Sequence, residues 1–211
     1  MIRTTAADLL AAVPVELHRR RLWTVYRLEP EVDADTGKVT KYGKQISPVG
    51  RPGVDASNTR PKDWSLLSTA LGAVGRGEAD GPVIAAGDTD LALVDVDGAV
   101  DADGRIVPAA LALLEPFRGV AFVDLSPSGT GVHVIARAPG ITDKLFVKAT
   151  ANHLAGLADR EAQVSAGTQP QFLTVTGAVP DGFEVSTLAD CTEQVRALAD
   201  RLASLKQAGE A

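Results

Sequence analysis

The sequence is poor in cysteine and histidine, and this scarcity excludes several kinds of site. Its 211 residues include one cysteine, Cys191, and three histidines. A single cysteine cannot form an intrachain disulfide, and no Cys/His cluster has the spacing of a zinc site. We therefore expect the reducing environment of a cytoplasm.

Long apolar runs and an excess of positive charge are also missing. No stretch of about 18 apolar residues predicts a membrane span, and residues 4–13 lack the basic start and apolar middle of a signal peptide. The net charge of −6 argues against a protein that coats nucleic acid by electrostatics alone. With 45% hydrophobic residues the chain can form a folded core, so we expect a soluble protein with no membrane partner.

Residues 1 to about 80 have the pattern of a small α/β lobe. The segments combine apolar residues at helical spacing, strand-like runs, and proline or glycine residues at the expected ends of helices and at turns. The expected elements are a helix over 9–17 that kinks at Pro14, a hairpin of strands 22–28 and 39–46 around a loop at 30–38, and a helix at about 64–71 that starts near Pro61.

Short strands dominate residues from about 81 to 185. We expect strands at 82–86, 91–97, 119–125, 131–138, 162–166 and 171–177, and helices at 108–117 and about 146–159. This order favours an α+β fold with an antiparallel or mixed sheet backed by helices. An amphipathic helix within 186–211 is expected to pack on the same domain.

Asp95 and Asp97 are the first candidate site residues. Side chains alternate along the strand that contains them, so both acids share one face while Val94 and Val96 point to the other. Adjacent like charges are unfavourable unless a cation, a proton or water relieves them, and hard divalent metals bind carboxylate oxygens. Two solvated acids at a strand end are the simpler alternative.

Two other known motifs compete for this segment. An EF-hand-like calcium loop with Gly104 as its glycine would put Ala99 and Ala110 at ligand positions, where neither can coordinate. A strand that ends in Asp95-Val96-Asp97 also resembles haloacid-dehalogenase-type phosphohydrolases, in which the first Asp is the nucleophile. The acidic motif that such enzymes carry downstream is missing after residue 126, so this alternative is weaker but stays open.

A loop rich in serine and glycine is the second candidate feature. Residues 126–134 read SPSGTGVHV. Glycines allow a tight loop with exposed N–H groups, and the hydroxyls of Ser128 and Thr130 can donate to phosphate oxygens. His133 and Arg137 project from one face of the following strand and could meet a triphosphate. A plain hairpin turn is the alternative, and the absence of a P-loop lysine gives no support to a Walker-type NTPase.

The ordered set of motifs resembles the primase-polymerase domains of the archaeo-eukaryotic primase superfamily, particularly those of phage and plasmid replication proteins. The motifs are 44–48 (KQISP), 56–64 (ASNTRPKDW), Asp95-Val96-Asp97, 128–133 (SGTGVH) and 172–177 (FLTVTG). The resemblance implies a metal-dependent DNA primase or polymerase. Its catalytic domain would cover residues 1–185, with an N-terminal lobe of about 1–80 and an RRM-like catalytic lobe of about 81–185.

The resemblance also implies roles for single residues. Asp95 and Asp97 would bind two Mg²⁺ or Mn²⁺ ions, and His133 would hold the triphosphate. The implied nucleotide-binding set is Ser128, Gly129, Thr130, Gly131 and His133, and Arg137 is a candidate for the same task from the phase of its strand alone. Implied partners are a single-stranded DNA template, nucleoside triphosphates and a replicative helicase, fused to the C-terminal helix or separate, in a bacterial host cytoplasm.

The sequence departs from this family at its third motif. Such domains place an acid on a strand shortly before a Thr-Gly ending, often followed by an arginine. Gln163 stands at the position of the acid and Gln171 at that of the arginine. Glu161 lies two residues from Gln163 and shares its face of a strand, so it is the candidate third metal ligand. A catalytically degenerate nucleic-acid-binding module is the third functional hypothesis.

Overall fold

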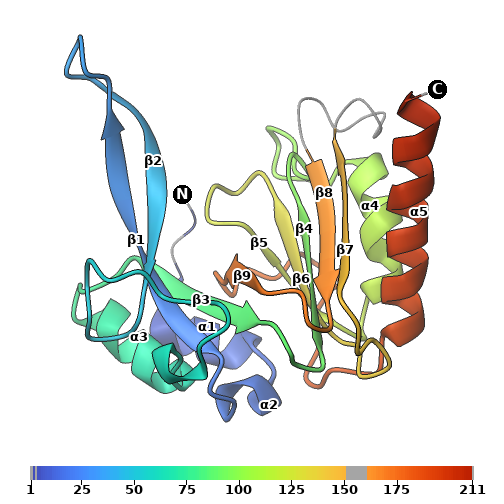
Figure 1. Cartoon of the computed structure of the whole chain (residues 1–211), viewed down its shortest axis with the longest axis horizontal. Coiled ribbons are helices and arrows are strands. Elements are labelled where there is room, and N and C mark those ends of the chain that lie inside the picture. Colours follow the sequence, from blue (N-terminus) through green and yellow to red (C-terminus); the bar gives the residue numbers. More distant parts are fainter. Residues whose placement is uncertain (1, 3, 151–160, 211) are drawn as a thin grey trace.

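The computed structural model describes residue 2 and residues 4–150 and 161–210 (Figure 1). The strands are β1 (Trp23–Val32), β2 (Val39–Ser47), β3 (Gly81–Ala86), β4 (Leu91–Val96), β5 (Phe122–Leu125), β6 (Val132–Arg137), β7 (Leu145–Thr150), β8 (Glu161–Ala166) and β9 (Gln171–Thr174). The helices are α1 (Ala6–Ala12), α2 (Val15–His18), α3 (Leu67–Gly75), α4 (Pro108–Leu114) and α5 (Thr192–Glu210), with short 3-10 helices η1 (Pro61–Asp63) and η2 (Glu115–Phe117). These elements make the α+β fold that the sequence predicts.

Two antiparallel sheets form the molecule. The N-terminal sheet has the order β2-β1-β3-β9, and the C-terminal sheet has the order β5-β6-β4-β8-β7. The chain therefore crosses from one sheet to the other more than once. β3 and β9, which we assigned to the C-terminal lobe, pair in the N-terminal sheet, so no simple boundary near residue 81 divides the lobes.

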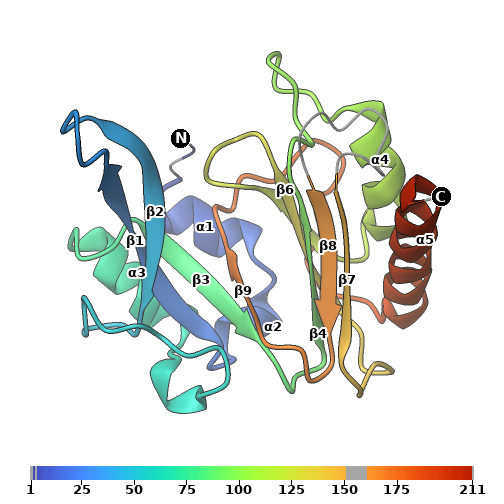
Figure 2. The same ribbon diagram turned by 45° about the horizontal axis from the view of Figure 1, so that its top comes forward.

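The β1–β2 hairpin projects from the N-terminal sheet as an arm (Figures 1 and 2). β1 pairs with β2 along most of its length but with β3 only from Trp23 to Tyr26. The loop predicted at 30–38 is shorter than expected, because Pro30 lies within β1 opposite Tyr42. A proline has no N–H to donate, and it is tolerated here because this part of β1 has only one neighbouring strand.

The N-terminal helices differ from the prediction at one boundary. The break at Pro14 between α1 and α2 is confirmed. The helix expected at 64–71 begins at Leu67, because Ser65 and Trp23 exchange two backbone hydrogen bonds, of 2.6 and 3.1 Å. Those bonds hold residues before Leu67 in an extended conformation.

Helices α4 and α5 cover one face of the C-terminal sheet (Figure 1). Val94 and Val96 of β4 share a core with Leu114 of α4 and Leu202 of α5, so the predicted packing of the last helix on its own domain is confirmed. Among the helices in the described ranges, none is both long and apolar enough to span a membrane.

The helix expected at about 146–159 is wrong where the chain is described. Leu145–Thr150 forms β7, in which more buried and exposed side chains alternate with a period of two. That period places Leu145, Val147 and Ala149 on the α5 side of an edge strand. The rest of this prediction lies outside the described residues.

Candidate functional site

The phase of β4 places Asp95 on the face of the C-terminal sheet that is turned away from α4 and α5. Ala92, Val94 and Val96 lie in the core beneath the helices. Leu91 and Leu93 point the other way, into a second core that includes Trp23 of the N-terminal sheet. Asp95 follows in the same alternation, so the predicted orientation relative to Val94 and Val96 is confirmed.

Asp95 lies between two polar side chains of neighbouring strands. The register pairs it with His133 of β6 and Gln163 of β8. Its Oδ1 lies 3.6 Å from Nε2 of His133, and its Oδ2 accepts a long hydrogen bond of 3.4 Å from the Gln163 amide. Burial raises the pKa of Asp95, although the positive charge of Lys44 opposes the rise. Oδ1 is buried and has no hydrogen-bond partner.

His133 is held from its other ring nitrogen. Nδ1 lies 2.8 Å from the backbone oxygen of Thr174 on β9. A carbonyl oxygen can only accept, so Nδ1 carries the hydrogen and Nε2 is the nitrogen directed toward Asp95. Burial lowers the pKa of His133, because the charged imidazolium loses its hydration.

Asp124 is a buried residue of the site that the sequence interpretation missed. It lies on β5 directly opposite His133, with Oδ1 3.8 Å from Nδ1. Its Oδ2 accepts hydrogen bonds from the backbone N–H groups of Thr176 and Gly177, at 2.6 and 3.0 Å. Burial raises the pKa of Asp124 despite these bonds. The signal was an acid in the middle of an apolar strand, which is rare unless the acid has partners.

Asp97 lies in the turn after β4 rather than in the strand itself. Its N–H donates to the backbone oxygen of Glu161 at 2.8 Å, which ties the turn to β8. The charge of Asp97 acts on both His133 and Lys44, raising the pKa of each. Asp95 and Asp97 thus lie near the same two basic side chains. The described residues contain no group of three or more His, Cys, Asp or Glu side chains arranged to hold a metal ion.

The two polar residues of the third motif, Glu161 and Gln163, lie close to Asp95. The negative charge of Glu161 is already balanced by a lysine. Glu161 and Gln163 both lie on β8, as the sequence predicts. The Glu161 carboxylate forms an ion pair of 2.6 Å with Lys148 of β7. Gln163, and not Glu161, is the residue that contacts Asp95.

The loop at 126–131 runs past the end of β4. Its hydroxyls form a chain, with Ser126 to Ser128 and Ser128 to Thr130 both at 2.9 Å. A Cβ at Gly131 would lie 3.2 Å from the Val96 oxygen, so this glycine allows the loop to approach β4 closely.

The backbone of this loop is less available for phosphate than we expected. The N–H groups of Gly129, Thr130 and Gly131 all donate within the loop, to Ser126 or Ser128. The exposed hydroxyls of Ser128 and Thr130 are therefore the donors that a ligand could recruit without breaking the turn.

Arg137 is not brought to the site. The register pairs it with Leu91, four residues along β4 from Asp95. At about 3.4 Å per residue this separation is roughly 14 Å. Its backbone oxygen instead accepts from the N–H of Cys191, next to the start of α5.

Lys44 of β2 completes the surroundings of Asp95 from the other sheet. Its Nζ lies 3.4 Å from Oγ1 of Thr174 and 5.9 Å from the centre of the Tyr26 ring. Lys44 as a residue is exposed, but burial of its ammonium group lowers its pKa. The negative charges of Asp95 and Asp97 oppose this decrease. Thr174 therefore contacts Lys44 through its hydroxyl and His133 through its backbone oxygen.

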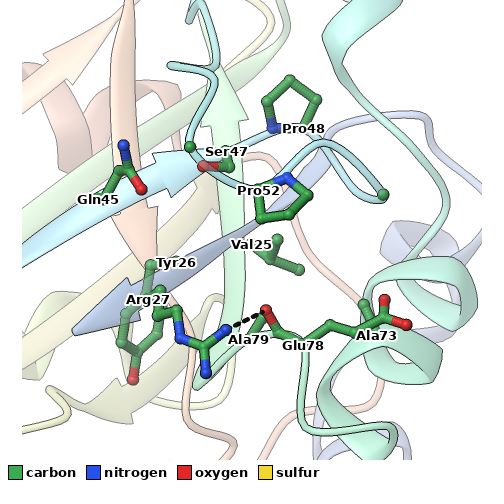
Figure 3. A pocket seen from close by; sticks show the side chains of 12 residues that line it. Val25, Tyr26, Arg27, Gln45, Ser47, Pro48, Pro52, Ala73, Glu78 and Ala79 are labelled. Carbon is green, nitrogen blue, oxygen red and sulfur yellow. Dashed lines mark hydrogen bonds between the residues drawn. The ribbon is translucent and has the colours of Figure 1, made fainter. Parts of the chain in front are cut away.

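A cavity of about 350 Å³ lies beside the hairpin and contains none of the predicted site residues (Figure 3). Arg27, Gln45 and Ser47 line it, and Nη1 of Arg27 lies 3.5 Å from the backbone oxygen of Glu78. Lys44 alternates with Gln45 along β2, so its side chain is on the other face. The cavity is separate from the group around Asp95.

No family model matches the chain, and no curated protein matches its sequence. The resemblance to primase-polymerases therefore rests on the sequence motifs alone.

Proposed function

We propose that this chain catalyses template-dependent transfer of nucleotides from nucleoside triphosphates to DNA. The observation that carries the proposal is the buried Oδ1 of Asp95, which faces Nε2 of His133 and has no hydrogen-bond partner. A buried carboxylate oxygen without a donor is unfavourable unless a cation satisfies it. Asp97 lies in the next turn and acts on the same two basic groups, so the donor set suits a hard divalent cation.

Each residue has a specific task in this proposal. Asp95 and Asp97 would hold Mg²⁺ or Mn²⁺, which when bound offsets the negative charge that develops during phosphoryl transfer. Thr174 holds the His133 ring through Nδ1, so that Nε2 faces Asp95, and Nε2 would have to take up a proton to donate to a triphosphate. Ser128 and Thr130 would donate their exposed hydroxyls to phosphate oxygens.

The partners in this proposal come from the family resemblance. They are a single-stranded DNA template and nucleoside triphosphates, within phage or plasmid replication in a bacterial cytoplasm. A replicative helicase, fused or separate, would act on the same DNA.

Primer extension tests the proposal directly. Purified chain, a primed template and labelled nucleotides of both sugars are incubated with Mg²⁺ or Mn²⁺. Asp95→Ala and Asp97→Ala should each abolish incorporation, whereas Asp103→Ala, on an exposed turn, should retain it. Incorporation by the Asp95→Ala/Asp97→Ala double variant would refute the proposal.

A catalytically degenerate DNA-binding module is the second candidate, and the third motif favours it. Gln163 is neutral, and Glu161 is paired with Lys148. Template binding by the unaltered chain with no incorporation under any metal condition would support this function. The phosphohydrolase alternative would use Asp95 as a nucleophile, but the acidic motif that such enzymes carry downstream is missing after residue 126. Release of phosphate from monoesters by the purified chain would favour the phosphohydrolase alternative.

A further inference from the structure

The position that would carry a third metal-binding acid is neutral in this chain. Gln163 lies directly opposite Asp95 in the β4–β8 register, and its amide donates to Oδ2 of Asp95. An amide supplies no charge to offset a second divalent ion. The nearest acid on β8, Glu161, has its charge balanced by Lys148 at 2.6 Å.

A fixed cation reaches the same group from the N-terminal sheet. The ammonium of Lys44 is placed by two contacts, the Thr174 hydroxyl at 3.4 Å and the Tyr26 ring at 5.9 Å. Thr174 also holds His133, so Lys44 and His133 approach Asp95 from a shared anchor. Asp95 and Asp97 both interact with the charge of Lys44.

Counted over the protein side chains alone, the charge favours a single divalent ion. Two carboxylates offset one divalent cation, and a nearby ammonium opposes the binding of another because like charges repel. We propose, on the basis of the proposed function, that the site uses one divalent cation. The Lys44 ammonium supplies the positive charge that a second cation would otherwise provide. Lys44 would then meet the triphosphate at the mouth of the site, as a point charge.

Lys41 provides a matched control for Lys44. It lies on the same strand, three residues away, and so projects from the opposite face. It pairs with Glu31 at 3.2 Å and is exposed, so Lys41→Met changes the net charge by the same amount as Lys44→Met without touching the site.

Native mass spectrometry of the full chain counts the ions directly. The chain is mixed with Mn²⁺ and a non-hydrolysable deoxynucleoside triphosphate, and manganese is counted in the nucleotide complex. The unaltered chain and Lys41→Met should each carry one Mn²⁺. The double variant Lys44→Met/Gln163→Glu removes the ammonium and adds a carboxylate, and it should carry two.

Primer extension supplies an independent readout. Lys44→Met should lower incorporation by about 100-fold, the effect of removing one preorganised electrostatic contact, and Lys41→Met should leave it unchanged. Two Mn²⁺ on the unaltered chain, or one on the double variant, would overturn the inference. If the unaltered chain carries two ions and incorporates nucleotides, only this inference fails. If it neither binds Mn²⁺ nor incorporates nucleotides, the proposed function fails with it.

Discussion

Asp95 lies where its negative charge costs stability. Its side chain is 25% exposed, one oxygen has no hydrogen-bond partner, and burial raises its pKa. An acid whose pKa is higher in the folded state stabilises the fold at low pH, and this stability is lost as the pH rises through the folded pKa. We therefore expect the ionised Asp95 to lower the free energy of unfolding at neutral pH when no cation is present.

Asp95→Asn should raise the melting temperature in the presence of a chelator at neutral pH. The neutral amide avoids the cost of the buried charge, and each kcal/mol gained is worth about 2–4 °C for a chain of this size. The gain should shrink toward pH 4, where the Asp95 carboxyl becomes protonated. Thermal melts between pH 4 and pH 8 measure this, with Asp103→Asn as the surface control. A variant that melts below the unaltered chain at pH 7.5 would contradict the argument.

Asp124, like Asp95, has a pKa raised by burial and one buried oxygen without a hydrogen-bond partner, but its other oxygen accepts from backbone N–H groups. Asp124→Ala leaves the buried N–H group of Thr176 and the partly buried N–H group of Gly177 without an acceptor. Each unsatisfied buried donor costs about 1–3 kcal/mol, so we expect a loss on the order of 3 kcal/mol in urea unfolding. Asp124→Asn keeps one acceptor oxygen and should lose less.

Asp190→Ala is the control for this comparison. Asp190 also accepts from a backbone N–H, that of Thr192 at 2.9 Å, but it is exposed to water. Its loss should cost about 1 kcal/mol or less, because water can replace the acceptor. Equal losses at Asp124 and Asp190 would show that burial of the acceptor does not matter.

At the scale of elements, the approach of the 126–131 loop to β4 depends on Gly131. A Cβ there would lie 3.0 Å from Oγ of Ser126 and 3.2 Å from the Val96 oxygen, and the latter is backbone that cannot easily move. We expect Gly131→Ala to destabilise by about 1–3 kcal/mol and to weaken nucleotide binding by shifting Ser128 and Thr130. Gly75→Ala has no atom within 4 Å of the added Cβ and should be neutral or slightly stabilising.

Chemical denaturation and nucleotide titration of both glycine variants check this prediction. A Gly131→Ala chain with unaltered stability and nucleotide affinity would show that the loop does not need this close approach.

Local patterns predicted most of the strands because side-chain alternation depends only on neighbouring residues. The strand face of Asp95 and the break at Pro14 follow from such local rules. The error at β7 arose because the apolar residues of 145–150 fit either period when only a short segment is read. Pairing with β8 is what makes that segment a strand.

At the scale of the whole molecule, one hydrophobic core joins the two sheets. Leu93 and Ile135 of the C-terminal sheet share a buried cluster with Trp23 and Leu67. β3 and β9 pair in the N-terminal sheet although the chain that joins them passes through the C-terminal one. We therefore expect the lobes to unfold together.

Leu114→Ala tests this cooperativity from the far side of the C-terminal sheet. Truncating this fully buried leucine should cost about 2–5 kcal/mol. Both tryptophans, Trp23 and Trp64, lie in the N-terminal part, so their fluorescence reports on the N-terminal sheet. The urea midpoints from fluorescence and far-UV circular dichroism should shift together. A shift in circular dichroism alone would mean that the lobes unfold independently.

The sequence by itself determined the α+β class, the strand that carries Asp95, the position of His133 on a strand and the neutral residue at 163. These features depend on alternation and residue type, which are local. Only the tertiary structure decided that Lys44, Thr174 and Asp124 converge on His133 and Asp95, and that Arg137 lies elsewhere. Strand order and register bring together residues up to about 130 positions apart, and no local spacing encodes which strands will pair.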